Sequence, residues 1–562
     1  MSEADISLRG MRLSKAAPAA ASAKFAAPEV ATAGPAPAFG PEARASNVFA
    51  SDALAFPDAV TAPRAGAATT ERLAALLQRA ISFPAMLGML LVGAVFVAGS
   101  IFSVDPDLWW HIRVGQEILS THHWPTTDPY SFTVAGQPWM AYEWLGEVLL
   151  GGIARLAGLQ GLMALLIVLA SAVILSLYGY TTLRSGNSKA AFVTCAVLYA
   201  LTTPFFSMRP QMLGYFFLIL TLIALERFRQ GKPRFMWFLP LILLLWVNTH
   251  GSFIIGLGTI FVYWLAGLKK FELGGIEARE WTAAQRTRLE LIFLLCLAVL
   301  PITPYGTRLA VYPFDMALSQ PVNVANIQEW QSMPFNLMGG KIFLALLLGF
   351  FVAQVAFRLT WRAEELALFL FGTMMACLHL RFLILFVPFF APLLVTIFAR
   401  WVPRYDRKKD IFVLNAALMA LVIGSIVHYF PTDAEMHKLV AKTYPADAVQ
   451  YLRQHPLPGP MFNTYGFGGY LVWALPQQKV FIDGRGDVFE RGGVFSDYLH
   501  IANLKPGALA VLDGYHVQFC LLERDEPLST VLAVSPEWRR IYTDGVSALY
   551  VRNPGPAASR KN

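Results

Sequence analysis

The stretch FPAMLGMLLVGAVFVAGSIF, residues 83–102, is followed almost at once by DPDLWWHI, residues 105–112. The first segment has no charged residue and is as long as the ~20 residues that a helix needs to cross a membrane. The second segment places two carboxylates, two tryptophans and a histidine where that helix leaves the bilayer. Because charge at this depth is costly to desolvate, acidic residues at such a boundary indicate a functional site.

The composition is that of an integral membrane protein. Of the 562 residues, 56% are hydrophobic and only 15% are charged, whereas a soluble domain averages about 25% charged residues. The net charge is +8, but the basic residues lie in short loops between apolar runs, which is a topology signal and argues against a nucleic-acid partner. The four cysteines are scattered, and their spacing predicts neither a metal site nor a disulfide.

Eleven apolar runs predict eleven membrane spans, several of them shorter than a straight crossing needs. The runs cover residues 83–103, 160–183, 190–207, 212–226, 235–249, 252–268, 289–303, 341–359, 365–379, 382–399 and 411–430. A basic cluster follows every second run, and loops rich in Lys and Arg face the cytoplasm. We therefore expect a multi-pass protein of a bacterial-type inner (cytoplasmic) membrane, with its N-terminus cytoplasmic and its C-terminus extracytoplasmic.

The predicted fold class is an all-α polytopic membrane domain at residues 81–432 with a small extracytoplasmic α/β domain at 433–553. Residues 1–80 are rich in Ala and Pro and are expected to form a disordered cytoplasmic tail, and residues 554–562 a second polar tail. A large first outer loop spans residues 104–158. These divisions place the first outer loop and the C-terminal domain together on the extracytoplasmic side of the membrane.

Several segments outside the spans have a regular pattern. Residues 143–158 predict an amphipathic helix that lies along the membrane surface. In the C-terminal domain a helix is expected at 446–454, and Gly466, Gly468 and Gly469 are expected to mark turns. Strands are predicted at 479–482, 517–522 and 547–551.

The two carboxylates of residues 105–112 have different expected roles. Pro106 suits the first turn of a helix, and Asp105 suits the N-cap before it. Asp107 and His111 are four residues apart and share one helical face. The helix dipole in the first turn favours the ionised form of Asp107, which suits a general base towards a hydroxyl group.

Tryptophans lie beside the charged residues in the first outer loop and in the loop before the eighth predicted span. Trp109 and Trp110 are interpreted as anchors at the membrane interface, with a sugar-stacking role as the alternative. Glu329 and Trp330 lie in the long loop before the eighth predicted span. They are expected to belong to an ordinary interfacial loop, and the alternative is an acceptor-side carboxylate with a stacking surface.

Three motifs in the first outer loop point to a family. They are DLWWHIRVGQEIL at residues 107–119, Trp124-Pro125, and GQPWMAYEW at residues 136–144. Together they resemble the first outer loop of GT-C glycosyltransferases, and they look most like the protein O-mannosyltransferase and aminoarabinose-transferase branch. The resemblance covers roughly residues 83–200 in motif detail. It implies polyprenyl-phosphate-linked sugar donors at the extracytoplasmic face and aligns Asp107 with the family's catalytic acid.

The loop departs from the family pattern in two places. The branch usually has Asp-Glu in tandem, whereas this chain has Asp-x-Asp, whose oxygens also suit a divalent cation held by Asp105 and Asp107. The lysine that the resemblance places on the lipid phosphate is absent, and Glu143 lies in that stretch. Arg209 and Arg381, at the outer ends of spans, are expected to hold the phosphate instead, with snorkelling to lipid headgroups as the alternative.

Two further places carry polar residues in unusual settings. Asn248-Thr-His250-Gly251 interrupts two apolar runs, which is tolerated where the backbone lines a cavity or is buried in protein. His250 is expected either to bond a sugar or phosphate or to be a structural histidine. Asp483 and Arg485 of the outer domain are interpreted as a mutual ion pair, with acceptor recognition as the alternative.

The sequence thus predicts a glycosyltransferase that moves a sugar from a polyprenyl-phosphate-linked donor to a hydroxyl group of a glycan, lipid or protein acceptor. Asp107 and Asp105 are the catalytic candidates, and a divalent cation is possible. The predicted substrate-binding residues are His111, Glu143, Arg209, His250, Glu329 and Arg381. The alternatives are a transporter or flippase of lipid-linked saccharides and an O-antigen ligase-like or polymerase-like enzyme.

Overall fold

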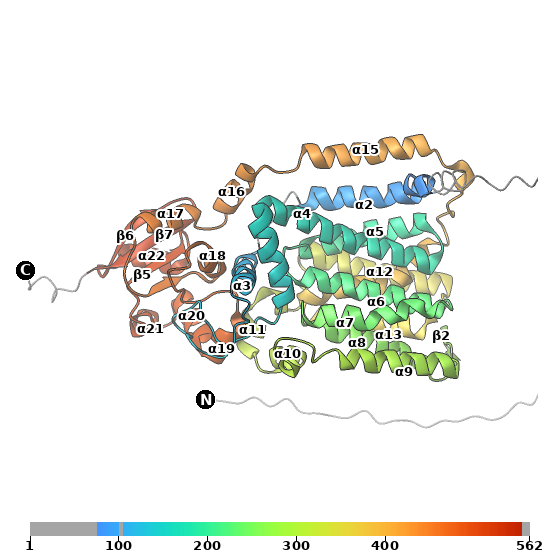
Figure 1. Ribbon diagram of the computed structural model, residues 1–562, viewed down its shortest axis with the longest axis horizontal. Helices are drawn as coiled ribbons and strands as arrows, with labels where there is room; N and C mark the ends of the chain where they lie inside the picture. Colours follow the sequence, from blue (N-terminus) through green and yellow to red (C-terminus); the bar gives the residue numbers. More distant parts are fainter. Residues whose placement is uncertain (1–75, 100–104, 554–562) are drawn as a thin grey trace, which may run out of the picture. The chain divides into compact units, whose positions relative to one another are not determined.

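The computed structural model describes residues 76–99 and 105–553 (Figure 1). All of these residues belong to one compact unit, residues 68–562. The tail predicted at 554–562, and all but the end of the tail predicted at 1–80, lie outside the described residues.

Each of the eleven predicted runs overlaps a helix. These helices are α2 (Phe83–Gly99), α4 (Trp144–Ser185), α5 (Ser188–Thr202), α6 (Gln211–Arg229), α7 (Leu239–Val247), α8 (Phe253–Ala266), α9 (Ala283–Ala298), α12 (Met338–Phe357), α13 (Ala363–Leu378), α14 (Leu383–Phe398) and α15 (Phe412–His428). Among the described residues, four helical segments are long and apolar enough to cross a membrane, namely α4, α6, α12 and Leu380–Phe398. A fifth is added if α15 and α16 (Asp433–Ala441), bent by 64°, form one span. The chain is therefore a multi-pass membrane protein, and eleven spans remain a prediction.

Helix α4 bends at Gly158, whose φ of 59° and ψ of −150° suit glycine alone. The part before the bend is the helix predicted at 143–158, and Figure 1 shows it running across the ends of the bundle helices. It packs on α3 (Leu108–Thr121) with almost no side chain between the two backbones. A β-carbon added to Gly115 would lie 1.8 Å from the carbonyl oxygen of Glu147, and one added to Gly151 would lie 2.6 Å from the amide nitrogen of Gln116.

The membrane domain is not purely helical, which corrects the all-α prediction. Its loops contain a small sheet of β1 (Phe271–Leu273), β2 (Ile276–Ala278) and β3 (Trp361–Arg362). Gly274 and Gly275 join β1 to β2 with positive φ angles of 57° and 83°, as a two-residue hairpin requires. The long loop before α12 is also ordered, as α10 (Thr307–Leu318), α11 (Pro321–Asn326) and η3 (Gln328–Trp330).

Buried ion pairs join the bundle helices at the end that carries this small sheet. Arg184 of α4 lies 2.5 Å from Glu365 of α13, and Arg362 lies 2.6 Å from Glu226 of α6. A third pair joins Arg229 to Glu364. Three of the predicted basic clusters therefore meet at one end of the bundle, where each guanidinium offsets a carboxylate that is almost fully buried.

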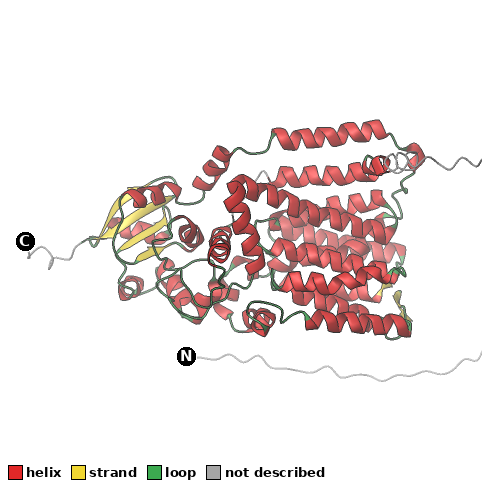
Figure 2. Ribbon diagram, viewed as in Figure 1, coloured by secondary structure: helices red, strands yellow, loops and turns green. Residues whose placement is uncertain are grey.

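The C-terminal domain is α/β, as predicted (Figure 2). Its four-stranded sheet has the order β4-β5-β7-β6, in which β4 and β5 are parallel and the other neighbours antiparallel. The strands are β4 (Met461–Asn463), β5 (Phe519–Glu523), β6 (Trp538–Thr543) and β7 (Ser547–Arg552). The helices after α16 are α17 (Ala446–Gln454), α18 (Tyr465–Ala474), α19 (Gly486–Arg491), α20 (Val494–Ala502), α21 (Ala508–Gly514) and α22 (Pro527–Val534).

Two local predictions in this domain are wrong. The segment 479–482 does not join the sheet, because Val480 forms only an isolated bridge with Ser131 of the first loop. Gly466, Gly468 and Gly469 lie inside α18 and do not mark turns. Gly468 and Gly469 instead allow close approach, since a β-carbon there would lie 2.0 Å from the carbonyl oxygen of Ile482 and 2.4 Å from that of Pro106, respectively.

The first loop and the C-terminal domain share one hydrophobic core, separate from the core of the bundle. Trp109 and Trp110 are almost fully buried in this shared core, with 0% and 2% of their surface exposed. The ring of Trp109 packs 5.4 Å from Tyr444, 5.0 Å from Tyr470 and 4.8 Å from Trp473. The interpretation of both tryptophans as membrane-interface anchors is therefore wrong, because the C-terminal domain covers them.

Candidate functional site

Arg209, just before α6, lies between three carboxylates. Its Nε is 2.6 Å from Asp105 Oδ2, its Nη2 is 2.8 Å from Asp107 Oδ2, and its Nη1 is 3.1 Å from Glu329 Oε1. The side chains of Asp105, Asp107 and Arg209 are only 11–20% exposed. The three acidic residues come from two loops that are far apart in the sequence. Each of the three guanidinium nitrogens of Arg209 contacts one of these carboxylates.

The start of α3 fixes where the two aspartates point. The helix begins at Leu108, so Asp107 occupies the N-cap position, although its side chain makes no capping bond. Asp105 Oδ1 accepts the backbone N–H of Asp107 at 3.0 Å, while its other oxygen faces Arg209. Asp107 Oδ1 accepts a hydrogen bond from Trp110 Nε1 at 3.1 Å. The N-cap predicted at Asp105 therefore lies two residues later, at Asp107, and Asp105 stabilises the turn before the helix.

A second polar group surrounds Glu143, the residue before α4. Glu143 lies 3.5 Å from His111 Nε2 and 3.5 Å from His250 Nε2. The other ring nitrogen of His111 lies 3.2 Å from Glu147 Oε1, and that of His250 lies 2.7 Å from Ser252 Oγ. The break between α7 and α8 that the sequence predicted at 248–251 places His250 in this group.

Arg381 approaches the same region from the start of α14. Its guanidinium lies 4.3 Å from the ring centre of Trp330, the neighbour of Glu329. Among the described residues Arg381 forms no ion pair with a carboxylate, in contrast to Arg209. Burial is the main cause of the raised pKa of Glu143 and of the lowered pKa of His250, and the charge of Arg381 opposes the first shift and adds to the second. Arg381 therefore offers a positive charge that is not paired with any acidic side chain in residues 76–99 and 105–553.

Burial raises the pKa values of the two central carboxyl groups, Asp107 and Glu143, by different amounts. Burial raises the pKa of Asp107 to about 6, although the charge of Arg209 opposes the rise. Burial raises the pKa of Glu143 to about 8, against the same opposing charge. The pKa of His250 falls to about 3 and that of His111 falls well below its usual range, again because of burial. Near pH 7 Asp107 is thus mostly ionised, Glu143 is mostly protonated, and both histidines are neutral.

The residues present do not fit a divalent cation between Asp105 and Asp107. The Arg209 guanidinium already contacts one oxygen of each carboxylate and offsets part of their negative charge. Within residues 76–99 and 105–553, no group of three or more His, Cys, Asp and Glu side chains is arranged to hold a metal ion. The Asp-x-Asp motif is therefore satisfied by a cationic side chain of the same protein.

All eight residues named from the sequence lie in or beside these two groups. Sequence reasoning missed Glu147 of α4, which contacts His111. It also missed the contact of Gly484 with Asp107, since a β-carbon on Gly484 would lie 1.8 Å from Asp107 Oδ1. No local pattern marks a glycine whose role is to leave room for a residue hundreds of positions away.

Several solved membrane glycosyltransferases have a structure similar to that of this chain. The chain is similar to the oligosaccharyltransferase AglB from Archaeoglobus fulgidus, solved with an inhibitory peptide and a dolichol-phosphate, with 12% identity, a TM-score of 0.47, and coverage of 78% of this chain and 69% of that one. It is also similar to ArnT from Cupriavidus metallidurans bound to undecaprenyl phosphate, with 14% identity, a TM-score of 0.44, and coverage of 88% and 99%. Both neighbours are GT-C membrane glycosyltransferases.

A third similar structure is the Archaeoglobus fulgidus oligosaccharyltransferase tethered to an acceptor peptide, with 12% identity, a TM-score of 0.48, and coverage of 83% of this chain and 74% of that one. No family model and no curated protein matches the sequence. Because every one of these TM-scores is below 0.5, the function proposed below depends on the side chains of this chain alone.

Proposed function

We propose that the protein is an inverting glycosyltransferase that moves a sugar from a polyprenyl-phosphate donor to an acceptor hydroxyl, with Asp107 as the general base. The carrying observation is the ionised, partly exposed carboxylate of Asp107, held by Arg209 and Trp110 at the end of the membrane bundle. Its pKa of about 6 lies close to neutral pH, where a general base is most effective.

In the proposed reaction Asp107 accepts the proton of the acceptor hydroxyl. The acceptor oxygen forms a bond to the anomeric carbon from the face opposite the phosphate, while the bond from that carbon to the phosphate oxygen breaks. Polyprenyl phosphate leaves with the bonding electron pair, and its added negative charge is offset by Arg381. One carboxylate suffices because phosphate is a good leaving group, whereas a glycoside hydrolase needs a pair.

The charge distribution supports separate roles for the two arginines. All three guanidinium nitrogens of Arg209 face carboxylates, so Arg209 keeps Asp107 oriented and limits the rise of its pKa. Arg381 lies against the ring of Trp330 and forms no ion pair with a carboxylate of the described residues, so its guanidinium is assigned to the phosphate oxygens. Of the two arginines that the sequence predicted as phosphate ligands, the proposal assigns this role to Arg381 and not to Arg209.

Glu143 and its two histidines form the neutral part of the proposed site. A protonated Glu143 and two neutral imidazoles are donors and acceptors that suit sugar hydroxyl groups. They also avoid placing a second negative charge beside the donor phosphate. No metal ion takes part in this proposal, because Arg209 stands between the two aspartates.

The test is donor turnover in proteoliposomes that contain undecaprenyl-phosphate-linked sugars and a lipid extract as acceptor. Wild type should release undecaprenyl phosphate, and Asp107→Asn should lower the rate by about 10²–10⁴-fold, the range for loss of a general base. Asp105→Asn is the matched control and should lower it less. A transporter or flippase would move the donor without releasing undecaprenyl phosphate, and an unchanged rate in Asp107→Asn would remove the assigned role of Asp107.

A further inference from the structure

The turn Asp483-Gly484-Arg485 of the C-terminal domain lies against the carboxylate of Asp107. A β-carbon on Gly484 would lie 1.8 Å from Asp107 Oδ1 and 3.1 Å from Trp110 Nε1. Gly484 does not have a positive φ angle, so its lack of a side chain serves this close approach and not an unusual backbone conformation. The backbone of the turn thus forms one wall of the space that Asp107 occupies.

A second glycine of the same domain holds the residue before Asp107. A β-carbon on Gly469 in α18 would lie 2.4 Å from the carbonyl oxygen of Pro106 and 3.3 Å from Trp110 Cδ1. Two separate elements of the C-terminal domain therefore press against the Pro106–Asp107 backbone and its carboxylate. The contact is steric, because both neighbours are backbone or a short side chain with little freedom to move.

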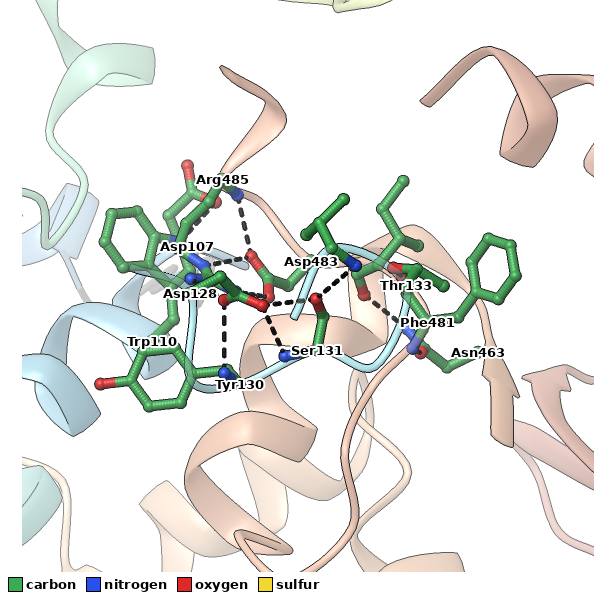
Figure 3. A network of polar contacts seen from close by, with 12 residues as sticks. Asp107, Trp110, Asp128, Tyr130, Ser131, Thr133, Asn463, Phe481, Asp483 and Arg485 are labelled. Atoms are coloured by element: carbon green, nitrogen blue, oxygen red, sulfur yellow. Dashed lines mark hydrogen bonds and ion pairs between the residues drawn. The ribbon is translucent and has the colours of Figure 1, made fainter. Parts of the chain in front are cut away.

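The turn itself is rigid. Arg485 bonds both oxygens of Asp483, at 2.8 and 2.6 Å, and Asp128 Oδ1 of the first loop at 2.6 Å (Figure 3). The side chains of Arg485, Asp483 and Asp128 are completely buried. The Arg485 guanidinium also lies 4.9 Å from the ring centre of Tyr130 and 4.7 Å from that of Trp139. The expected ion pair of Asp483 and Arg485 is thus confirmed, and Asp128 extends it into the first loop.

We infer that Gly484 is a positioning residue that acts through Asp107, so that the C-terminal domain forms a wall of the catalytic centre. The rigid turn stops the carboxylate from rotating away from Trp110 Nε1 and Arg209. The effect on catalysis rests on the proposed function, whereas the steric coupling of the two residues does not. The two parts are therefore tested by different measurements.

The first measurement is a double-mutant cycle of melting temperature with Gly484→Ala and Asp107→Ala in the full-length protein. Gly484→Ala should lower the melting temperature in wild type, and the decrease should largely disappear in the Asp107→Ala background, where the clashing carboxylate is gone. Gly514→Ala is the matched control, because Gly514 is exposed in the same domain with no atom within 4 Å of its added β-carbon. An equal decrease in both backgrounds would overturn the inference.

The second measurement separates kcat from KM with undecaprenyl-phosphate-linked sugars. Gly484→Ala should lower kcat about 100-fold, the effect of a displacement of about 1 Å, with little change in the donor KM. In the Asp107→Asn background it should have no further effect on the residual rate. A decrease of the same factor in both backgrounds would overturn the positioning role. If wild type has no activity at all, the proposed function fails, and the melting cycle still decides the steric coupling.

Discussion

Arg209 Nη2 lies 2.8 Å from Asp107 Oδ2, so a residue just before α6 and the residue before α3 form an ion pair at one end of the bundle. The same guanidinium contacts Asp105 and Glu329. One positive charge thus holds together three acidic side chains from two loops. The cluster is only partly exposed, so its charges depend on one another more than exposed surface charges would.

Replacement of Arg209 by alanine should destabilise the protein strongly. The change leaves three carboxylates without their shared cation, and loss of one partner of a buried ion pair costs about 3–5 kcal/mol. Thermal or denaturant unfolding in detergent measures the effect. Arg113→Ala is the control, because Arg113 pairs with Glu117 where both side chains are about a third exposed, and it should cost about 0–1 kcal/mol. Equal losses in the two variants would contradict the role of Arg209.

Arg381→Ala should weaken donor binding with little effect on stability. A hydrogen bond to a charged group contributes about 1.5–3 kcal/mol, so the KM for undecaprenyl-phosphate-linked sugars should rise about 10–100-fold. The melting temperature should stay near wild type, since no carboxylate of the described residues pairs with Arg381. Arg308, an exposed cation of α10, is the control, and Arg308→Ala should leave the KM unchanged. A KM that does not respond to Arg381→Ala would exclude it as the phosphate ligand.

The pH dependence of kcat/KM should be bell-shaped. The rate should rise as Asp107 ionises through its pKa of about 6 and fall as Glu143 loses its proton through its pKa of about 8. Glu143→Gln keeps the neutral form at every pH, so it should abolish the alkaline decrease and retain the acidic one. A variant that still loses activity above pH 8 would show that another group causes the alkaline limb.

The stability of the protein should also report on Asp107. Its pKa is raised in the folded state, so its contribution to stability is fully present below the unfolded pKa of 3.8 and is lost as pH rises through about 6. The loss is on the order of 2–3 kcal/mol, from 1.36 kcal/mol for each pKa unit. Asp107→Asn removes this titration. The stability difference between wild type and Asp107→Asn should therefore change between pH 4 and pH 8 in favour of the variant, and a difference independent of pH would contradict the raised pKa.

Arg485→Leu should destabilise the contact between the first loop and the C-terminal domain. The variant leaves Asp128 and Asp483 buried without a cation, which costs about 3–5 kcal/mol. Unfolding in detergent measures this cost. Arg524→Ala in the same domain is the control, because Arg524 pairs with an exposed Asp525 and should contribute little.

The positions of helices and of the chemically important residues were largely predictable from the sequence. Apolar runs and loop charges mark a membrane helix by local composition alone, and each predicted run overlaps a helix. The helix at 446–454 has the predicted bounds for the same reason, since its apolar residues recur with helical spacing. Asp107 stood out because charge beside an apolar run is costly without a purpose, and Glu143 because it lies in the stretch where the family resemblance implies a lysine.

Other features were not predictable because they depend on partners far away in the chain. Gly468 and Gly469 suggested turns by composition, yet they lie in a helix that presses on Ile482 and Pro106. Trp109 suggested a membrane anchor, yet residues 444–473 of the C-terminal domain cover its ring. In both cases the prediction was wrong because tertiary packing, and not the local pattern, decides what the residue contacts.

Two features follow from the amino-acid sequence alone: the chain crosses a membrane several times, and acidic residues follow the first apolar run. Hydrophobicity and loop charge are local properties, so no folded contact is needed to read them. Which charges lie together depends on the tertiary structure. It places Arg209 between Asp105 and Asp107, and it brings Gly484 against the carboxylate of Asp107. Such contacts join residues that are distant in the sequence. Burial at these contacts sets the pKa values of the carboxyl groups that take part in them.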